Sequence, residues 1–252
     1  MKMASSKRNL LSLWLVLFPT FLVLWYWPDI TFSIRVLGWA VAAALLGGSI
    51  LYGWNFKILR TLLLGSCGAM VLFLLWPWHC NEDRSALRAD YCAALKSYSG
   101  CRYVWGGEGY FGIDCSGFVR KGLEDTLAYH GFLTLNPYLV RESIFLYWHD
   151  TTAKVIGQGY SGRTQRVTTC SSLNALDYAK LLPGDLAVTA SGDHVLAYLG
   201  DRSWIAADPI EGKVTTFVIP EKTNVYFSTP MNIVRWEILS PSPNWIGDEM
   251  SH

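Results

Sequence analysis

The chain has 252 residues and a formal net charge of +1 at neutral pH, enough for one or two domains. Phosphate binding needs a basic excess, so this charge balance argues against nucleic acid as the main partner. The average composition hides two different parts. Residues 10–78 are almost uncharged and rich in Leu, Trp, Gly and Ala, whereas residues 80–252 carry an ordinary mixture of charges.

Three uncharged runs lie in the first part, at residues 10–27, 36–54 and 61–78. A helix of this length, at about 1.5 Å per residue, covers most of a bilayer core roughly 30 Å thick. We therefore predict a membrane anchor over residues 1–80 with three transmembrane helices, and the lipid bilayer as a partner. One alternative is a cleaved signal peptide, but the first run lacks a small-residue cleavage site. Another is a buried soluble core, but such helices are rarely apolar on every face.

Basic residues near the runs predict their orientation, because Lys and Arg stay on the cytoplasmic side. Lys2, Lys7 and Arg8 precede the first run, Lys57 and Arg60 flank the turn between the second and third, and the opposite side shows only Arg35. Three crossings would then place residues 81–252 outside the cytoplasm.

The cysteines agree with an oxidising compartment. Cys80, Cys92, Cys101 and Cys170 lie in the outer part together with Cys115, so four could pair while one stays free. The pairs that we favour are Cys92 with Cys101 and Cys80 with Cys170. The alternative is four small buried thiols.

The second part begins with helical patterns and continues with short strands. We predict a helix over residues 82–99 that ends at Gly100, a second helix that begins at Asp114, and a third over residues 138–149. Residues 157–172 are polar and predicted to be a loop. Strands are predicted at residues 186–189, 194–199, 204–207, 214–219 and 233–238, with glycines between them. Helices followed by strands indicate an α+β domain with an antiparallel sheet.

The sequence Asp-Cys-Ser-Gly-Phe at residues 114–118 is the main indication of the chemistry. Asp114 is a favoured N-cap, which puts Cys115 at the positive end of a helix dipole. That position favours the thiolate, the reactive form of a cysteine nucleophile. Gly117 permits close approach by a neighbouring segment, and Phe118 is expected in the core. A cysteine at a helix start is, on its own, more often structural than catalytic.

A nucleophilic cysteine needs a base, and His194 is the best placed histidine. It opens an apolar strand directly after a Ser-Gly-Asp turn, which fixes the imidazole on a rigid element and leaves one side open for substrate. His130 and His149 lie in the irregular region, where each is expected to be a surface or packing residue.

Four linked motifs are similar to those of the NlpC/P60 family. They are Tyr-Val-Trp-Gly-Gly at 103–107, Asp-Cys-Ser-Gly-Phe-Val at 114–119, Leu-Pro-Gly-Asp-Leu at 182–186, and His-Val at 194–195 with Tyr-Leu-Gly at 198–200. The resemblance covers roughly residues 85–220, and its cysteine-before-histidine order is that of the unpermuted branch. It implies a papain-like core in residues 81–252, with a helix that bears the cysteine packed on an antiparallel sheet that bears the histidine.

The resemblance also implies an activity and a location. Family members are cysteine hydrolases that cleave peptidoglycan stem peptides, typically between γ-D-glutamyl and a diamino acid. A multi-pass anchor in the bacterial cytoplasmic membrane, with the catalytic domain on the extracytoplasmic side, would reach that substrate. No cofactor is implied, and no Cys/His cluster has the spacing of zinc ligands. The sequence does not identify a protein partner.

Further site residues follow from the same resemblance. Tyr103 is expected to line the site, and Asp114 and Ser116 to help hold the substrate, while backbone N–H groups at the helix start, including that of Cys115, would form the oxyanion hole.

The third catalytic residue is harder to identify from the sequence than Cys115 and His194. Relatives place a polar residue on the strand after the base, and counting from His194 leads to Ala206, which has no polar side chain. Asp208 shares that face but lies about 6–7 Å further along. A bulge could bring its carboxylate under the imidazole. The alternative is that Asp208, followed by Pro209, only shapes a turn.

The chain departs from the family in residues 126–165, which look like an insertion rich in aromatic residues. This insertion either caps the groove, lies on the membrane, or adds to the core. Two other functions compete with cell-wall hydrolysis. They are a lipid-directed thiol acyltransferase or lipase, and a non-catalytic membrane module.

Overall fold

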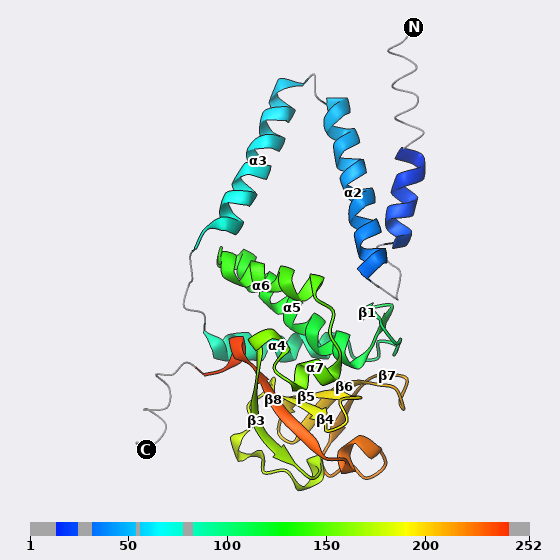
Figure 1. Cartoon of the computed structure of the whole chain (residues 1–252), viewed down its shortest axis with the longest axis vertical. Helices are drawn as coiled ribbons and strands as arrows, with labels where there is room; N and C mark the ends of the chain where they lie inside the picture. Colours follow the sequence, from blue (N-terminus) through cyan, green and yellow to red (C-terminus); the bar gives the residue numbers. More distant parts are fainter. Residues whose placement is uncertain (1–13, 25–31, 54–55, 78–82, 242–252) are drawn as a thin grey trace. The chain divides into compact units, whose positions relative to one another are not determined.

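A computed structural model describes residues 14–24, 32–53, 56–77 and 83–241. The chain divides into two compact units, Met1–Pro77 and Trp78–His252 (Figure 1).

The first unit is helical. A short apolar helix, Trp14–Leu24, is followed by α2 (Phe32–Gly53) and α3 (Lys57–Leu75). Both α2 and α3 are long and apolar enough to cross a membrane, and each begins four residues before its predicted run. The run at 10–27 is described only over its middle, which is the apolar helix Trp14–Leu24. The structure therefore describes two candidate spans where three were predicted.

The second unit begins with helices that the sequence anticipates closely. The Asp83 carboxylate accepts hydrogen bonds from the N–H groups of Ser85 and Ala86, so α4 runs over Arg84–Ser97. A short hairpin of β1 (Glu108–Gly109) and β2 (Gly112–Ile113) leads into α5 (Cys115–Leu133). The helices α6 (Pro137–Trp148) and α7 (Ala153–Gly157) follow.

Six strands form one antiparallel sheet in the order β3-β8-β4-β5-β6-β7. They are β3 (Thr164–Cys170), β4 (Leu186–Thr189), β5 (Val195–Gly200), β6 (Ser203–Asp208), β7 (Lys213–Val218) and β8 (Met231–Trp236). Short 3₁₀ helices lie between them: η1 (Tyr160–Gly162), η2 (Leu173–Ala175), η3 (Tyr178–Lys180), η4 (Val225–Ser228) and η5 (Glu237–Leu239). The predicted α+β class is confirmed.

Strand β3 was missed, because residues 157–172 were predicted to be a loop. It is an edge strand that pairs only with β8, and its sequence Thr-Gln-Arg-Val-Thr-Thr-Cys is mostly solvated or half-buried. An edge strand with polar side chains lacks the apolar alternation on which the prediction relied.

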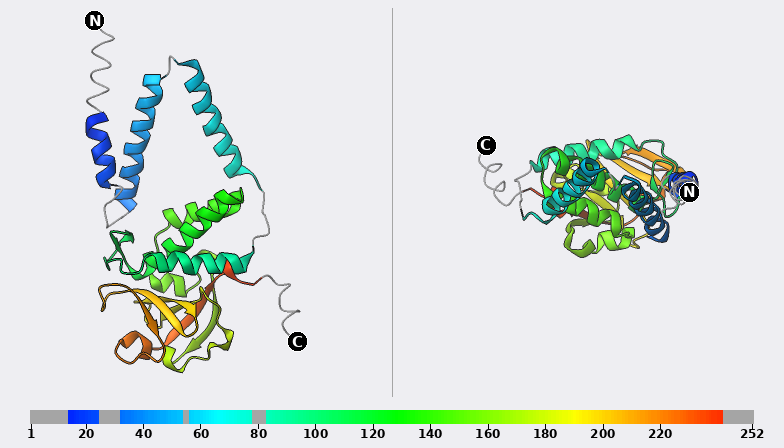
Figure 2. Two further views of the ribbon diagram at one scale, coloured as in Figure 1. Left: turned by 180° about the vertical axis from the view of Figure 1, so that it is seen from behind. Right: turned by 90° about the horizontal axis from the view of Figure 1, so that it is seen from above.

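The core lies on both faces of the sheet. Helices α4 and α5 pack on one face, where Leu95, Phe118 and Val195 belong to one buried cluster (Figure 2). The other face carries a second cluster that includes Leu196, Trp204 and Phe227. Neighbouring residues of β5 thus enter different clusters, as the alternation of a strand requires.

The insertion predicted at residues 126–165 forms the end of α5, then α6 and α7. Leu139, Val140 and Leu146 are buried, so this part adds to the core. Gly131 allows the close packing, since a side-chain carbon there would lie 2.9 Å from the backbone nitrogen of Val140. Tyr129 remains exposed on the same insertion.

The favoured disulfide between Cys92 and Cys101 is wrong, because both are free thiols. Cys170 is a free thiol too, and Cys80, its favoured partner, lies outside the described residues. Cys92 points into the core toward the carbonyl of Tyr198, whereas the Sγ of Cys101 lies 3.0 Å from the carbonyl of Tyr110. Burial raises the pKa of Cys92 to about 11, as expected of an inert buried thiol.

Candidate active site

The start of α5 is built by the Asp114 side chain. Its Oδ1 accepts the backbone N–H of Gly117 at 2.6 Å and the hydroxyl of Ser116 at 3.0 Å, while its Oδ2 accepts the N–H of Gly106 at 3.0 Å. The predicted N-cap is therefore confirmed. Gly117 is required because a Cβ there would lie 2.7 Å from the carbonyl oxygen of Gly107.

Cys115 is the first residue of α5 and is buried, with 5% of its surface exposed. Its Sγ lies 4.0 Å from the carbonyl oxygen of Asp193, and the backbone N–H of Val195 also interacts with the thiol. His194 is the residue between these two. The start of α5 and the start of β5 therefore bring Cys115 beside the chain segment that carries the predicted base.

The resting thiol is neutral, contrary to the expectation from the helix dipole. Burial, followed by the nearby Asp114 carboxylate, raises the pKa of Cys115 to about 12. The backbone N–H of Val195, and then those of Ser116 and Cys115 at the helix start, lower the pKa, but by less than these two effects raise it. Desolvation disfavours the charged form of any acid, and here it outweighs the partial charge of one helix end.

His194 is fully buried immediately before β5. Neither ring nitrogen has a hydrogen-bond partner among the described residues. Burial lowers the pKa of His194 to about 4, against the opposing effect of the Asp208 carboxylate. The ring of Tyr226 stacks on the imidazole, with centroids 4.0 Å apart. The imidazole is thus neutral at rest and held on one face.

Asp208 is the last residue of β6 and is fully buried. The pairing of Ala197 with Ile205, extended along both strands, places Asp208 opposite His194. Its Oδ2 lies 3.9 Å from the Nε2 of His194, which is longer than a hydrogen bond. Counting by analogy with relatives predicts Ala206 at this position, whereas the register of β5 and β6 places Asp208 there.

The carboxylate of Asp208 also shapes the turn that follows β6. Its Oδ1 accepts the N–H groups of Ile210 at 2.7 Å and Glu211 at 3.0 Å, and its Oδ2 accepts the side-chain amide of Asn224 at 2.7 Å. Both predicted roles, a neighbour of the imidazole and a turn former, thus have a geometric basis in one side chain.

The two remaining predicted residues lie near the thiol in different ways. Tyr103 is half-buried, and its pKa is raised by burial and then by Cys115, Asp114, Tyr226 and Asp208, so it faces the site. Ser116 is buried, and its hydroxyl donates to Asp114. Its hydroxyl therefore supports the helix start in this structure.

Two residues at the site were missed by the sequence reasoning, Asn224 and Tyr226. They lie between β7 and β8, where no motif and no periodicity marks them. Only the fold brings this segment to His194, so no signal in one sequence identifies it.

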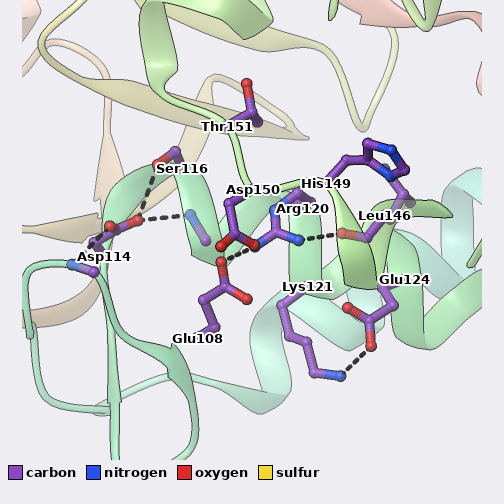
Figure 3. A network of polar contacts seen from close by, with 12 residues as sticks. Glu108, Asp114, Ser116, Arg120, Lys121, Glu124, Leu146, His149, Asp150 and Thr151 are labelled. Atoms are coloured by element: carbon purple, nitrogen blue, oxygen red, sulfur yellow. Dashed lines mark hydrogen bonds and ion pairs between the residues drawn. The ribbon is translucent and has the colours of Figure 1, made fainter. Parts of the chain in front are cut away.

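An ion cluster around a buried arginine joins the insertion to the helix that carries Cys115 (Figure 3). Arg120, five residues after Cys115, is 1% exposed and contacts the carboxylates of Glu108 and Asp150 and the carbonyl of Leu146. These partners come from the β1 hairpin, from α6 and from the segment directly after α6, so the insertion holds α5 in place. In the described part of the chain, no group of three or more His, Cys, Asp or Glu residues could hold a metal ion.

Comparison with solved structures gives distant matches. An NlpC/P60 family protein from Bacillus cereus is 21% identical, with a TM-score of 0.40, over 59% of this chain and 40% of that chain. The peptidoglycan hydrolase RipB from Mycobacterium tuberculosis is 19% identical, with a TM-score of 0.39, over 78% of this chain and 88% of that one. An N-acetylmuramoyl-L-alanine amidase from Bacteroides uniformis is 13% identical, with a TM-score of 0.42, over 60% and 99%. The chain thus spans less than half of the B. cereus protein.

None of the curated proteins matches this chain. The model of the NlpC/P60 family matches residues 100–235, more than half of the sequence and the whole of the site described above. This stretch includes all four motifs noted in the sequence, with Cys115, His194 and Asp208 among its residues. The chain belongs to the NlpC/P60 family.

Proposed function

We propose that the chain is a membrane-anchored cysteine hydrolase that cleaves a peptide bond in peptidoglycan stem peptides, of the γ-D-glutamyl to diamino acid type. The observation that carries this proposal is the position of the Cys115 thiol against the backbone on either side of His194. Membership of the NlpC/P60 family supports the substrate class.

The charge states set the course of the reaction. With the pKa of Cys115 raised to about 12 and that of His194 lowered to about 4, both groups are neutral at pH 7. His194 therefore accepts the thiol proton as Sγ attacks the carbonyl carbon of the substrate, acting as a general base during attack. Backbone N–H groups at the start of α5 stabilise the oxyanion that forms.

The second half of the reaction returns the proton. The imidazolium of His194 donates it to the leaving amine as the C–N bond breaks, which leaves an acyl group on Sγ. A water molecule, deprotonated by His194, then attacks this thioester, and the released thiolate takes the proton back. Asp208 stabilises the imidazolium in both halves, since its carboxylate lies 3.9 Å from Nε2.

The full chain in mild detergent should be incubated with purified peptidoglycan fragments and, separately, with labelled phospholipid. We expect a new amine from the stem peptide, and no product from either substrate with Cys115→Ser. Cys101→Ser is the matched control, because Cys101 is a free, half-buried thiol against the carbonyls of the β1–β2 hairpin. Release of fatty acid instead would favour the lipid-directed function.

The anchor is part of this proposal and has its own test. The helices α2 and α3 and the basic residues around them predict a domain outside the cytoplasm. A reporter that is active only outside the cytoplasm should be active after residue 252 and inactive after residue 57. The reverse pattern would put peptidoglycan out of reach.

A further inference from the structure

The segment between β7 and β8 covers the imidazole of His194. Asn224 of this segment is 3% exposed and makes two side-chain hydrogen bonds in opposite directions. Its Nδ2 donates to the Oδ2 of Asp208 at 2.7 Å, and its Oδ1 accepts the backbone N–H of Tyr226 at 3.0 Å. One amide therefore connects the carboxylate beside the imidazole with the residue whose ring stacks on it.

We propose that Asn224 is a positioning residue for His194, acting through Asp208 and Tyr226. This inference deepens the proposed function, on which it rests for the roles of Cys115 and His194. The side chain of Asn224 bonds Asp208 and Tyr226, not the thiol or the imidazole, so its effect on catalysis is indirect.

The position of the Asp208 carboxylate explains why such a residue matters. The imidazole becomes cationic only after it takes the thiol proton, and its Nε2–H then needs an acceptor. The Oδ2 of Asp208 is 3.9 Å away, so an approach of about 1 Å completes a hydrogen bond. The bond from Asn224 to this same oxygen fixes its position, while Oδ1 is held by the turn after β6.

Several titratable groups surround the imidazole of His194 and its neighbours Asp208 and Tyr226. Asp208 on β6 raises the pKa of His194 against the effect of burial. The groups that raise the pKa of Tyr226, after burial, are Asp208, Cys115 on α5 and Asp193 before β5. Tyr103, on the segment before β1, also interacts with Cys115, Asp114, Tyr226 and Asp208. Among these titratable residues, Asn224 is a neutral side chain that donates a hydrogen bond to the Asp208 carboxylate.

A purely structural role predicts a different outcome, because Asn224 is also the N-cap of η4. The substitution Asn224→Ser separates the two roles. Serine is about as good an N-cap as asparagine, so the segment keeps its cap, but serine is too short to reach Asp208. Asn174→Ser is the matched control. Asn174 is exposed and bonds the backbone of Glu221 and Phe227 in the same segment, away from the imidazole.

The test measures how fast iodoacetamide alkylates Cys115, from pH 5 to pH 10, by mass spectrometry of the peptide that contains it. The full chain in mild detergent is used, and no substrate is needed. We expect Asn224→Ser to slow alkylation near neutral pH roughly tenfold or more, since residues that orient a metal-binding side chain typically contribute about 10- to 100-fold and Asn224 orients Asp208 in the same way. Asn174→Ser should leave the pH profile within about twofold of the parent, because surface changes rarely matter more.

A double-mutant cycle with Asp208→Ala decides whether Asn224 acts through Asp208. If it does, Asn224→Ser adds nothing to the loss caused by Asp208→Ala. Additive losses, or a parental profile for Asn224→Ser, would overturn the proposal. Because alkylation needs no substrate, coupling observed in a protein that leaves peptidoglycan intact would sustain this inference and refute only the proposed substrate.

Discussion

The two halves of the candidate site are both buried, yet they are built in different ways. At the start of α5, Asp114 bonds Gly106, Ser116 and Gly117, all within eight positions of it in the chain. Around His194, by contrast, the contacts come from Asp208 and Tyr226, up to 32 positions away, and Asn224 bonds both of these residues. The first half is a local motif with a cap that the sequence reveals. The second exists only after three strands and a connecting segment have packed together.

This difference also appears in how each half controls charge. At the thiol, burial and the Asp114 carboxylate act together and raise the pKa. At the imidazole, burial lowers the pKa and the Asp208 carboxylate opposes it. Both groups therefore rest in the neutral form. When the proton moves to the imidazole, the Asp208 carboxylate in the half of the site around His194 stabilises the new positive charge.

Removal of the Asp208 carboxylate should have the largest effect in this comparison, because it disrupts the half of the site around His194. Asp208→Ala should lower kcat between roughly 10² and 10⁴-fold, because general acid–base catalysis by His194 loses its counter-charge. Asp208→Asn keeps an acceptor for the turn after β6 but removes the charge, and it should change the alkaline limb of the pH–rate profile.

A stably folded Asp208→Ala protein with parental turnover would remove Asp208 from the mechanism. Cys115 and His194 would then act as a dyad, with Asp208 serving only the turn that it makes with Ile210 and Glu211.

The buried imidazole of His194 should also make the stability of the fold depend on pH. The pKa of His194 is about 4 in the folded chain and near 6.5 when unfolded, so the unfolded state binds the proton more readily. The stability associated with the neutral imidazole is complete above pH 6.5 and is lost as the pH falls toward 4. The loss should be on the order of 3 kcal/mol.

Urea unfolding of the full chain in mild detergent at pH 7 and pH 4 measures this loss. His194→Gln lacks the titrating ring and should lose less stability over the same interval. An equal loss in both proteins would place the acid sensitivity in other groups.

The smallest effect is expected at the local half. Asp114→Asn keeps a good N-cap but removes the negative charge that raises the pKa of Cys115, so the pKa of the thiol should fall while burial still holds it above its usual value. Loss of the bond to Gly106 should cost about 1 kcal/mol. Thiolate absorbance as a function of pH measures the first change.

Asp83→Asn is the matched control for this substitution. Asp83 caps α4 through the N–H groups of Ser85 and Ala86, as Asp114 caps α5, but it does not contribute to the pKa of Cys115. If both variants shifted the thiol equally, the charge of Asp114 would not be the cause.

Much of the fold was predictable because its signals are local. The starts of α4 and α5 follow from Asp83 and Asp114, and five strands were recognised from short apolar runs between glycines. The edge strand β3 was missed because its polar residues look like a loop. The first membrane run is helical over Trp14–Leu24, and its two ends lie outside the described residues.

The family, the α+β class and the place of Cys115 at a capped helix start can be predicted from the sequence alone, because each depends on residues close together in the chain. The roles of Cys115, His194 and Asp208 in catalysis stay predictions. Other properties follow from the packing of distant segments: the thiol and imidazole rest uncharged, Cys92 and Cys101 do not pair, Asn224 bonds Asp208, and Tyr226 stacks on His194. Burial and strand register produce these properties, and both arise from contacts between segments whose separation in the sequence carries no local pattern.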